Sequence, residues 1–181
     1  MRYSLILILC LIVKTTFAAS VIRIKGEDAA TFAARLAPNR SAEVVKVIES
    51  SEWNFVSPVI IAFYKYPVTF ADKNKFYGDD PNDSVVIGYL YVPISASEYE
   101  RIEIDSYGPE GGNAEIVNVY FSKIDKQAKK SLLVDVHWYP QPGEIQQVCA
   151  YSKPQLNPPP KKLMPLNEPY RCNWALLLQP I

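Results

Sequence analysis

The sequence predicts an α+β fold: a single domain built on an antiparallel β-sheet of about five to seven strands, with one or two N-terminal helices and a Pro-rich C-terminal arm. Three observations lead to this prediction. Runs rich in β-branched and aromatic residues recur along the chain and are separated by turn-forming residues, a pattern typical of strands. A short segment near the N-terminus has helix-capping features. Six prolines fall within 154–169, where the chain is expected to be extended and without its own ladder of backbone hydrogen bonds.

The strongest pair of strand-like runs occupies 115–121 and 132–139. Both runs are apolar and rich in β-branched and aromatic residues, and Gly112 and Pro140 mark their outer limits. The segment between them, 123–130, is too charged to lie in a core and is long enough to reverse the chain. We therefore expect an antiparallel hairpin, around which the rest of the domain packs.

Further strands are expected on both sides of this hairpin. In one of them, 101–107, apolar and charged residues alternate, so Ile102 and Ile104 are expected to face the core. Glu103 and Asp105 are then expected to face water or a partner. The other predicted strands are 21–25, 59–66, 85–92 and 144–151, and an apolar tail at 174–178 is expected to dock on the core.

Two segments near the N-terminus have helical features. The segment 29–36 follows Asp28, a good N-cap residue, and stops before Pro38, which predicts a short helix. A second helix is expected from position 41 onward, because apolar residues recur there on one helical face. Its many β-branched residues favour a strand almost equally, so 42–50 stays open between the two.

The first 18 residues have the layout of a secretory signal peptide. Arg2 supplies a positive start, 5–13 an apolar run, and 16–18 a small-residue cleavage site. The apolar run is shorter than the roughly 20 residues of a membrane-spanning helix. A retained anchor is the alternative, and Lys14 disfavours it. We therefore expect an exported protein, periplasmic or extracellular, with one domain over 19–181 and no membrane span after cleavage.

The charge balance disfavours a nucleic-acid partner. Cleavage removes Arg2 and Lys14, so 17 of the 19 basic residues remain beside 19 acidic residues. The mature protein then has a net charge of about −2, whereas binding to nucleic acid needs a basic surface. Nothing in this balance points to an anionic membrane either.

The cysteines predict a disulfide and no metal site. Loss of Cys10 with the signal peptide leaves Cys149 and Cys172, which are expected to join in an oxidising compartment. Two separate buried thiols are the alternative. Two cysteines and the single His137 do not form a zinc-ligand set, and the acidic run at 79–83 has the irregular spacing of a solvated turn rather than that of a calcium loop. No metal and no cofactor are predicted.

His137 is the obvious catalytic candidate, because it is the only histidine in the chain and histidine titrates near neutral pH. Asp135 and His137 project from the same face of their predicted strand, as a base and the group orienting it would. Glu103, with Asp105 and Glu110, is a candidate carboxylate set for glycoside cleavage. The sequence has no Gly-x-Ser-x-Gly motif for a nucleophile. We therefore predict no catalytic residue, and a structural or solvent-facing role is the favoured interpretation.

Tyrosines are a more promising feature than any charged group. Tyr89 and Tyr91 share a strand face, and Tyr120 and Tyr139 are candidates to join them. Tyrosine offers a large contact area at a small entropic cost, as binding surfaces need. The competing and stronger interpretation is that these residues complete the core and its rim.

The leading functional hypothesis is an exported, non-enzymatic protein that binds another macromolecule. It would act on a partner protein, as an inhibitor or an immunity-type partner, through a tyrosine-rich sheet face and acidic loops. The expected contact residues are Tyr89, Tyr91, Glu103, Asp105, Tyr120, Asp135, His137 and Tyr139. The alternative is a cell-wall or carbohydrate hydrolase using Asp135, His137 or Glu103, and a passive envelope component is a third possibility.

Overall fold

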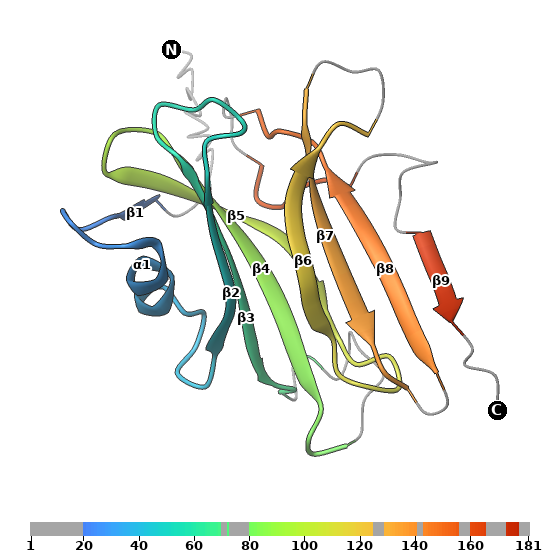
Figure 1. The fold of residues 1–181 in the computed structure, drawn as a ribbon. Helices are drawn as coiled ribbons and strands as arrows, with labels where there is room; N and C mark the ends of the chain where they lie inside the picture. The colour runs from blue at the N-terminus through green and yellow to red at the C-terminus, as the bar shows by residue number, and fades with distance from the viewer. Residues whose placement is uncertain are drawn as a thin grey trace, which may run out of the picture.

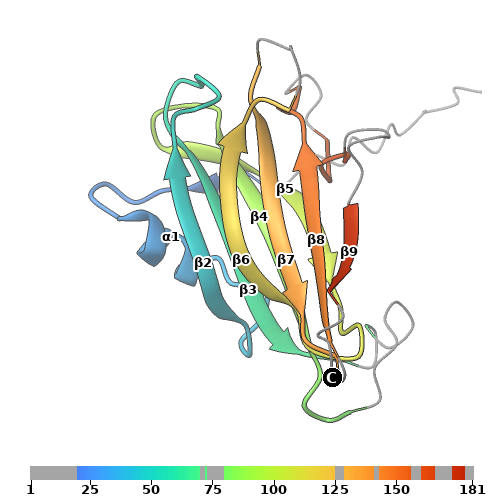
Figure 2. The same cartoon turned by 45° about the vertical axis from the view of Figure 1, so that its right-hand side comes forward.

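Two antiparallel sheets lie face to face, with one short helix on the outer side of the first (Figures 1 and 2). The computed structural model describes residues 20–69, 72, 80–124, 129–140, 143–155, 160–165 and, for the backbone alone, 173–177. The predicted signal peptide and Cys172 lie outside these ranges.

Each sheet is a continuous antiparallel array. Sheet A has the strand order β1-β5-β4-β3-β2, and sheet B has the order β6-β7-β8-β9. The strands of sheet A are β1 (Ser20–Ile22), β2 (Glu43–Ser50), β3 (Val59–Pro67), β4 (Ser84–Pro93) and β5 (Glu98–Tyr107). Those of sheet B are β6 (Glu115–Ser122), β7 (Ser131–Trp138), β8 (Glu144–Tyr151) and β9 (Asn173–Leu177).

The prediction of a single sheet is therefore wrong, although the antiparallel pairing and the mainly β content are as expected. The reason lies in two separate cores. An inter-sheet core joins sheets A and B, with Ile61 and Phe63 of β3 facing Val134 and Val136 of β7. A helix-side core lies on the other face of sheet A, where Phe32 of the helix packs. Sheet A is thus covered on both faces, and its central strands are apolar on both sides for that reason.

The predicted hairpin is present as β6 and β7. Their register pairs Ile116 with Val136 and Val119 with Val134. The predicted inner face of β7 is also confirmed, because Leu132, Val134, Val136 and Trp138 are buried in the inter-sheet core. The turn residues 125–128 lie outside the described part of the chain.

The segment left open between helix and strand is strand β2, so a second N-terminal helix is wrong. β2 pairs with β3 over its whole length, with an irregularity between Val44 and Lys46. Valine and isoleucine fit a pleated, half-buried edge better than a helix, because their branched Cβ restricts them in helices. Pairing with β3 therefore decides a segment whose own pattern is ambiguous.

The first predicted helix is present as α1 (Ala29–Arg35). The Asp28 side chain accepts a hydrogen bond from the backbone N–H of Thr31 at 2.7 Å, which caps its N-terminus. Phe32 and Ala33 are fully buried against sheet A. Within the described ranges, no helix has the length and apolar character that a membrane crossing needs.

The described part of the Pro-rich arm runs along β5. β1 pairs only with Glu98, Tyr99 and Glu100, so the rest of that edge is open. On this open edge, the backbone carbonyl of Glu103 accepts a hydrogen bond from the backbone N–H of Leu163 at 2.7 Å. The backbone N–H of Glu103 donates one to the carbonyl of Lys161 at 3.0 Å. The arm is predicted to lack backbone pairing, whereas the structure gives it these two bonds and an isolated antiparallel bridge between Tyr151 and Pro165. The Leu163 side chain is buried in the inter-sheet core.

Candidate functional site

His137 lies on the outer face of sheet B between two carboxylates. Its Nε2 is 3.1 Å from Asp135 Oδ1, and its Nδ1 contacts Glu144 Oε1. Gln146 donates from Nε2 to the same Asp135 oxygen at 3.1 Å. The β7–β8 register places Gln146 directly opposite His137, which explains why these side chains meet. We call these four residues the His137 cluster.

The arrangement of this cluster suits binding better than proton transfer. A neutral imidazole has one donor and one acceptor nitrogen, whereas an imidazolium has two donors. Because each ring nitrogen of His137 faces a carboxylate oxygen, the protonated ring satisfies both partners. Both nitrogens are thus engaged by contacts within the protein. The predicted contact between Asp135 and His137 therefore exists, but it belongs to a bridge between β7 and β8.

Of the predicted tyrosines, Tyr139 adjoins this cluster, and Tyr120 lies on β6 opposite Leu133. Tyr139 is 53% exposed and Tyr120 is 44% exposed. The ring centroids of Tyr139 and His137 are 6.2 Å apart. Desolvation and the nearby carboxylates of Glu115, Glu144 and Asp135 raise the pKa of Tyr139 above its usual value. The exposed Tyr139 ring therefore lies among acidic side chains.

The other two tyrosines lie elsewhere. Tyr91 is fully buried in the helix-side core, where its hydroxyl oxygen is 3.0 Å from that of Tyr64. Tyr64 in turn donates to the Ala33 carbonyl of α1 at 2.9 Å. Tyr89 packs against the same core, beneath the guanidinium of Arg101. The expectation that all four tyrosines share one face is wrong, because β4 turns its tyrosines toward α1, whereas Tyr120 lies on β6 and Tyr139 directly follows β7.

The predicted acids of β5 are occupied by contacts within the protein. Lys162 Nζ lies 2.6 Å from Asp105 Oδ1 and 3.6 Å from Glu103 Oε1. Burial lowers the pKa of Lys162, but the bond to Asp105 and the charges of both acids outweigh it and raise the pKa. Tyr151 donates to the other Asp105 oxygen at 3.0 Å. These two carboxylates fasten the C-terminal arm to β5, on a different sheet from His137.

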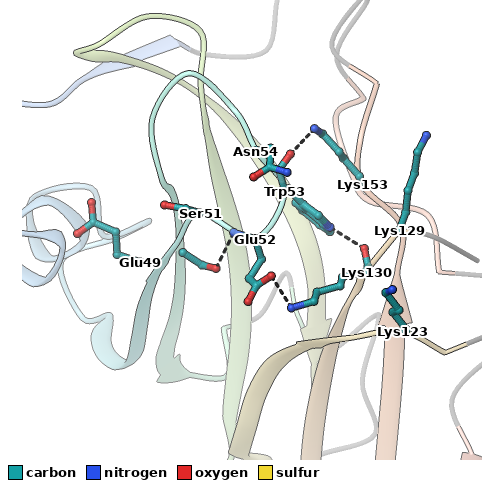
Figure 3. Close-up of a pocket in the computed structure, with 10 residues that line it drawn as sticks. Glu49, Ser51, Glu52, Trp53, Asn54, Lys123, Lys129, Lys130 and Lys153 are labelled. Carbon is teal, nitrogen blue, oxygen red and sulfur yellow. Dashed lines mark hydrogen bonds and ion pairs between the residues drawn. The ribbon is translucent and has the colours of Figure 1, made fainter.

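A cavity that the sequence did not predict opens at one end of the sandwich (Figure 3). Its volume is about 770 Å³, and it is lined by Glu49, Ser50, Ser51, Glu52, Trp53, Asn54, Lys123, Lys129, Lys130 and Lys153. We call it the lysine cavity. In Figure 3 the glutamates and serines come from the β2–β3 side and the lysines from the sheet B side. The only sequence signal was the lysine-rich run at 123–130, which we interpreted as a turn.

The lining of the lysine cavity includes neither a member of the His137 cluster nor Glu103. Across the described part of the chain, no group of three or more histidine, cysteine, aspartate or glutamate side chains is arranged to hold a metal ion. Cys149 is disulfide-bonded and buried in the inter-sheet core. Its predicted partner, Cys172, lies outside the described residues.

The fold and these surfaces define a two-sheet antiparallel β-sandwich with one external helix. No family model, no curated protein and no solved structure matches the chain.

Proposed function

We propose that the chain is an exported, non-enzymatic protein that binds a protein partner, of the inhibitor or immunity type, through the outer face of sheet B. We call this surface the tyrosine face and define it as Tyr120, Leu133, Asp135, His137, Tyr139 and Glu144. The observation that carries the proposal is the exposed Tyr139 ring beside three carboxylates and a histidine held in a fixed position.

The outer faces of the two sheets are not equivalent. The outer face of sheet A carries α1, whose Phe32 and Ala33 are fully buried against it (Figure 1). Over the outer face of sheet B, the described part of the chain places no helix (Figure 2). A sheet face that keeps large aromatic side chains exposed is a common feature of docking surfaces.

The chemistry of the tyrosine face favours a basic partner. Glu115 lies opposite His137 in the β6–β7 register, and its carboxylate contributes to the raised pKa of Tyr139. An arginine or lysine of a partner can stack on the Tyr139 ring while pairing with an adjacent carboxylate, a combination that recurs at the energetic centre of interfaces. The cross-strand contacts of His137 hold this surface in place before binding, which limits the entropy lost on association.

The acidic loop at 79–83 is not the basis of the proposal. In its described part, the Asp80 carboxylate accepts a hydrogen bond from the Asn82 backbone at 2.7 Å, and Asp83 accepts one from the backbone of Asp80 at 3.2 Å. Such bonds are typical of turns in which an acid caps its own backbone. We therefore base the proposal on the acids around Tyr139 and not on this loop.

The hydrolase alternative has less support from the geometry. A general base needs a nitrogen within reach of the substrate, whereas both nitrogens of His137 contact carboxylates. Glu103 lies on sheet A and contacts Lys162. The candidate residues therefore do not converge on one site, which favours the binding function.

The experiment uses a photo-reactive amino acid placed in the full-length secreted protein. It replaces Tyr120 or Tyr139 in one pair of variants, and Ile24 in the matched control, where the side chain is 59% exposed on the sheet A side. We expect one and the same protein to be cross-linked from both tyrosine positions and not from position 24. The purified product should then rebind the wild-type protein.

Adducts that form equally from position 24, or no adduct from either tyrosine position in the secretions of the producing cells, would count against the proposal. Hydrolysis of cell-wall material or of a glycan by the purified protein, lost in Asp135→Asn and His137→Ala, would support the alternative instead.

A further inference from the structure

We propose that the lysine cavity binds a small polyanion carrying two or more phosphate or sulfate groups. The cavity lies at the end of the sandwich, where the β2–β3 connection, the β6–β7 connection and the segment after β8 meet (Figure 3). Its residues are not those of the tyrosine face, so this proposal does not depend on the preceding one.

The first argument is the charge left over in the cavity. Of its two carboxylates, Glu49 pairs with Arg23 at 2.7 Å, and Glu52 pairs with Lys130 at 2.6 Å. Within the part of the chain that the structure describes, Lys123 and Lys129 have no hydrogen-bond or ion-pair partner. Both lysines are exposed. The acids are thus already neutralised, whereas lysine charge remains unpaired.

A third lysine adds to this excess. Lys153 Nζ donates to the Trp53 carbonyl and lies 4.0 Å from the centroid of the Phe55 ring. These partners orient the ammonium group without neutralising it, because a carbonyl and an aromatic ring carry no net charge. Lys153 therefore offers a positioned positive charge to the cavity.

The second argument is that the wall of the cavity is ordered. Trp53 is 4% exposed, and its ring packs edge-on against Phe121. The next residue, Asn54, has a φ of +49°, a left-handed conformation that few residues other than glycine adopt. Its backbone N–H donates to the Ser51 carbonyl at 2.9 Å, which fixes the turn. Asparagine tolerates this conformation better than most other non-glycine residues, so the residue type suits an ordered turn at this position.

The third argument concerns size and chemistry. A volume of about 770 Å³ fits a small organic ligand better than a single inorganic ion. Lysine ammonium groups are point charges on flexible stems and are common phosphate binders. The whole chain has 19 basic and 19 acidic residues, so it has no general attraction for a long polyanion. A compact ligand with several charges is the occupant that meets these conditions.

The test is calorimetric titration of the disulfide-intact full chain with tripolyphosphate and, separately, with sucrose octasulfate. The two probes distinguish phosphate from sulfate as the preferred group. We expect saturable binding of at least one probe, weakened when salt is raised because the lysines are exposed. A heparin polymer serves as the third arm.

The variant pair Lys123→Gln and Lys129→Gln, combined in one protein, is expected to weaken binding about tenfold, since each exposed charge pair changes an equilibrium by up to about fivefold. The matched control combines Lys25→Gln and Lys161→Gln, which remove the same charge from exposed lysines outside the cavity. Circular dichroism establishes that both proteins are folded.

A gain-of-affinity variant complements the loss. Glu52→Gln releases Lys130 from its ion pair, so we expect it to tighten binding about twofold to fivefold. Binding of neither small probe, binding of heparin alone, or an equal loss in both double variants would overturn the proposal. So would a decrease in affinity on Glu52→Gln.

Discussion

The indole Nε1 of Trp53 donates a hydrogen bond to the main-chain oxygen of Lys130 at 2.8 Å and thereby ties sheet A to sheet B. We expect Trp53→Phe to lower the free energy of unfolding by about 1 kcal/mol, because it removes the bond and keeps much of the packing. Trp53→Ala should lower it by about 3–5 kcal/mol, because it also leaves a cavity beside Phe121. Urea unfolding followed by circular dichroism measures both values. Equal, small effects of the two variants would contradict this role.

The ion pair between Glu27 and Arg35 of α1 should make the free energy of unfolding depend on pH in the acid range. Hydrogen bonds from Arg35, opposed by desolvation and helped by the backbone N–H of Ile24, lower the pKa of Glu27 from its ordinary 4.5 to about 2. A carboxyl group with a lowered pKa stabilises the folded state above its unfolded pKa and loses that effect as the pH falls through its folded pKa. The difference in unfolding free energy between wild type and Glu27→Gln should therefore be constant above about pH 5 and vanish near pH 2.

Urea titrations across this pH range check the Glu27 prediction. Glu110→Gln is the control, because Glu110 is exposed and its side chain has no ion pair among the described residues. A wild-type advantage over Glu27→Gln that persists unchanged to pH 2 would show that the Arg35 contact does not control the titration.

Gly88 of β4 allows the close approach of Phe63 in the inter-sheet core. A Cβ atom at position 88 would lie 2.5 Å from Phe63 Cε1, and Phe63 is fully buried, so its ring has little room to move. We expect Gly88→Ala to reduce the free energy of unfolding by about 1–3 kcal/mol through overpacking. In a Phe63→Leu background the same change should cost less, and denaturant unfolding of the four proteins measures the coupling. Strictly additive effects would argue against this steric explanation.

The predicted disulfide can be tested directly. Cys149 is disulfide-bonded, and the neighbouring Val148 pairs with Asn173, which follows Cys172 in the sequence. Mass spectrometry of a digest made without reductant should therefore yield a peptide linking 149 and 172. Cys172→Ser should lower the free energy of unfolding by about 3 kcal/mol, the value for closing a loop of this length. A linkage to Cys10 would contradict the expected pairing.

Individual strands were predictable because their signal is local. The alternation in β5 placed Ile102 and Ile104 in the core, and both are fully buried. The hairpin of β6 and β7 followed from two apolar runs with a charged turn between them. Where the local pattern was ambiguous between helix and strand, as in β2, pairing with the next strand, β3, determined that the segment is a strand.

The division into two sheets was not predictable from local pattern. The apolar run of β3 indicates a central strand whose two faces are both covered, but it does not show which elements cover them. The covering elements are α1 on one side and β7 on the other, which are distant in sequence. For the same reason, period-two alternation grouped Tyr89 with Tyr91 correctly but did not show that sheet B carries Tyr120 and Tyr139.

The two candidate sites differed in how far the sequence alone could predict them. Asp135 and His137 share a strand face and were grouped from spacing alone, whereas Glu144 joins them only through the β7–β8 register. The lysine cavity combines Trp53 with Lys153, a residue 100 positions away that contacts its carbonyl. No local sequence pattern predicts that two residues so far apart in the chain lie in the same cavity.

The binding function is tested most directly by the affinity of the purified partner, once cross-linked and identified, for variants of the tyrosine face. We expect Tyr139→Ala to raise Kd by at least about tenfold, as truncation of a central interface aromatic does. The control Ile94→Ala truncates a side chain that is 45% exposed after β4 of sheet A and should leave Kd unchanged. An unchanged Kd for Tyr139→Ala, together with a loss of affinity for Ile94→Ala, would contradict the assignment of the tyrosine face.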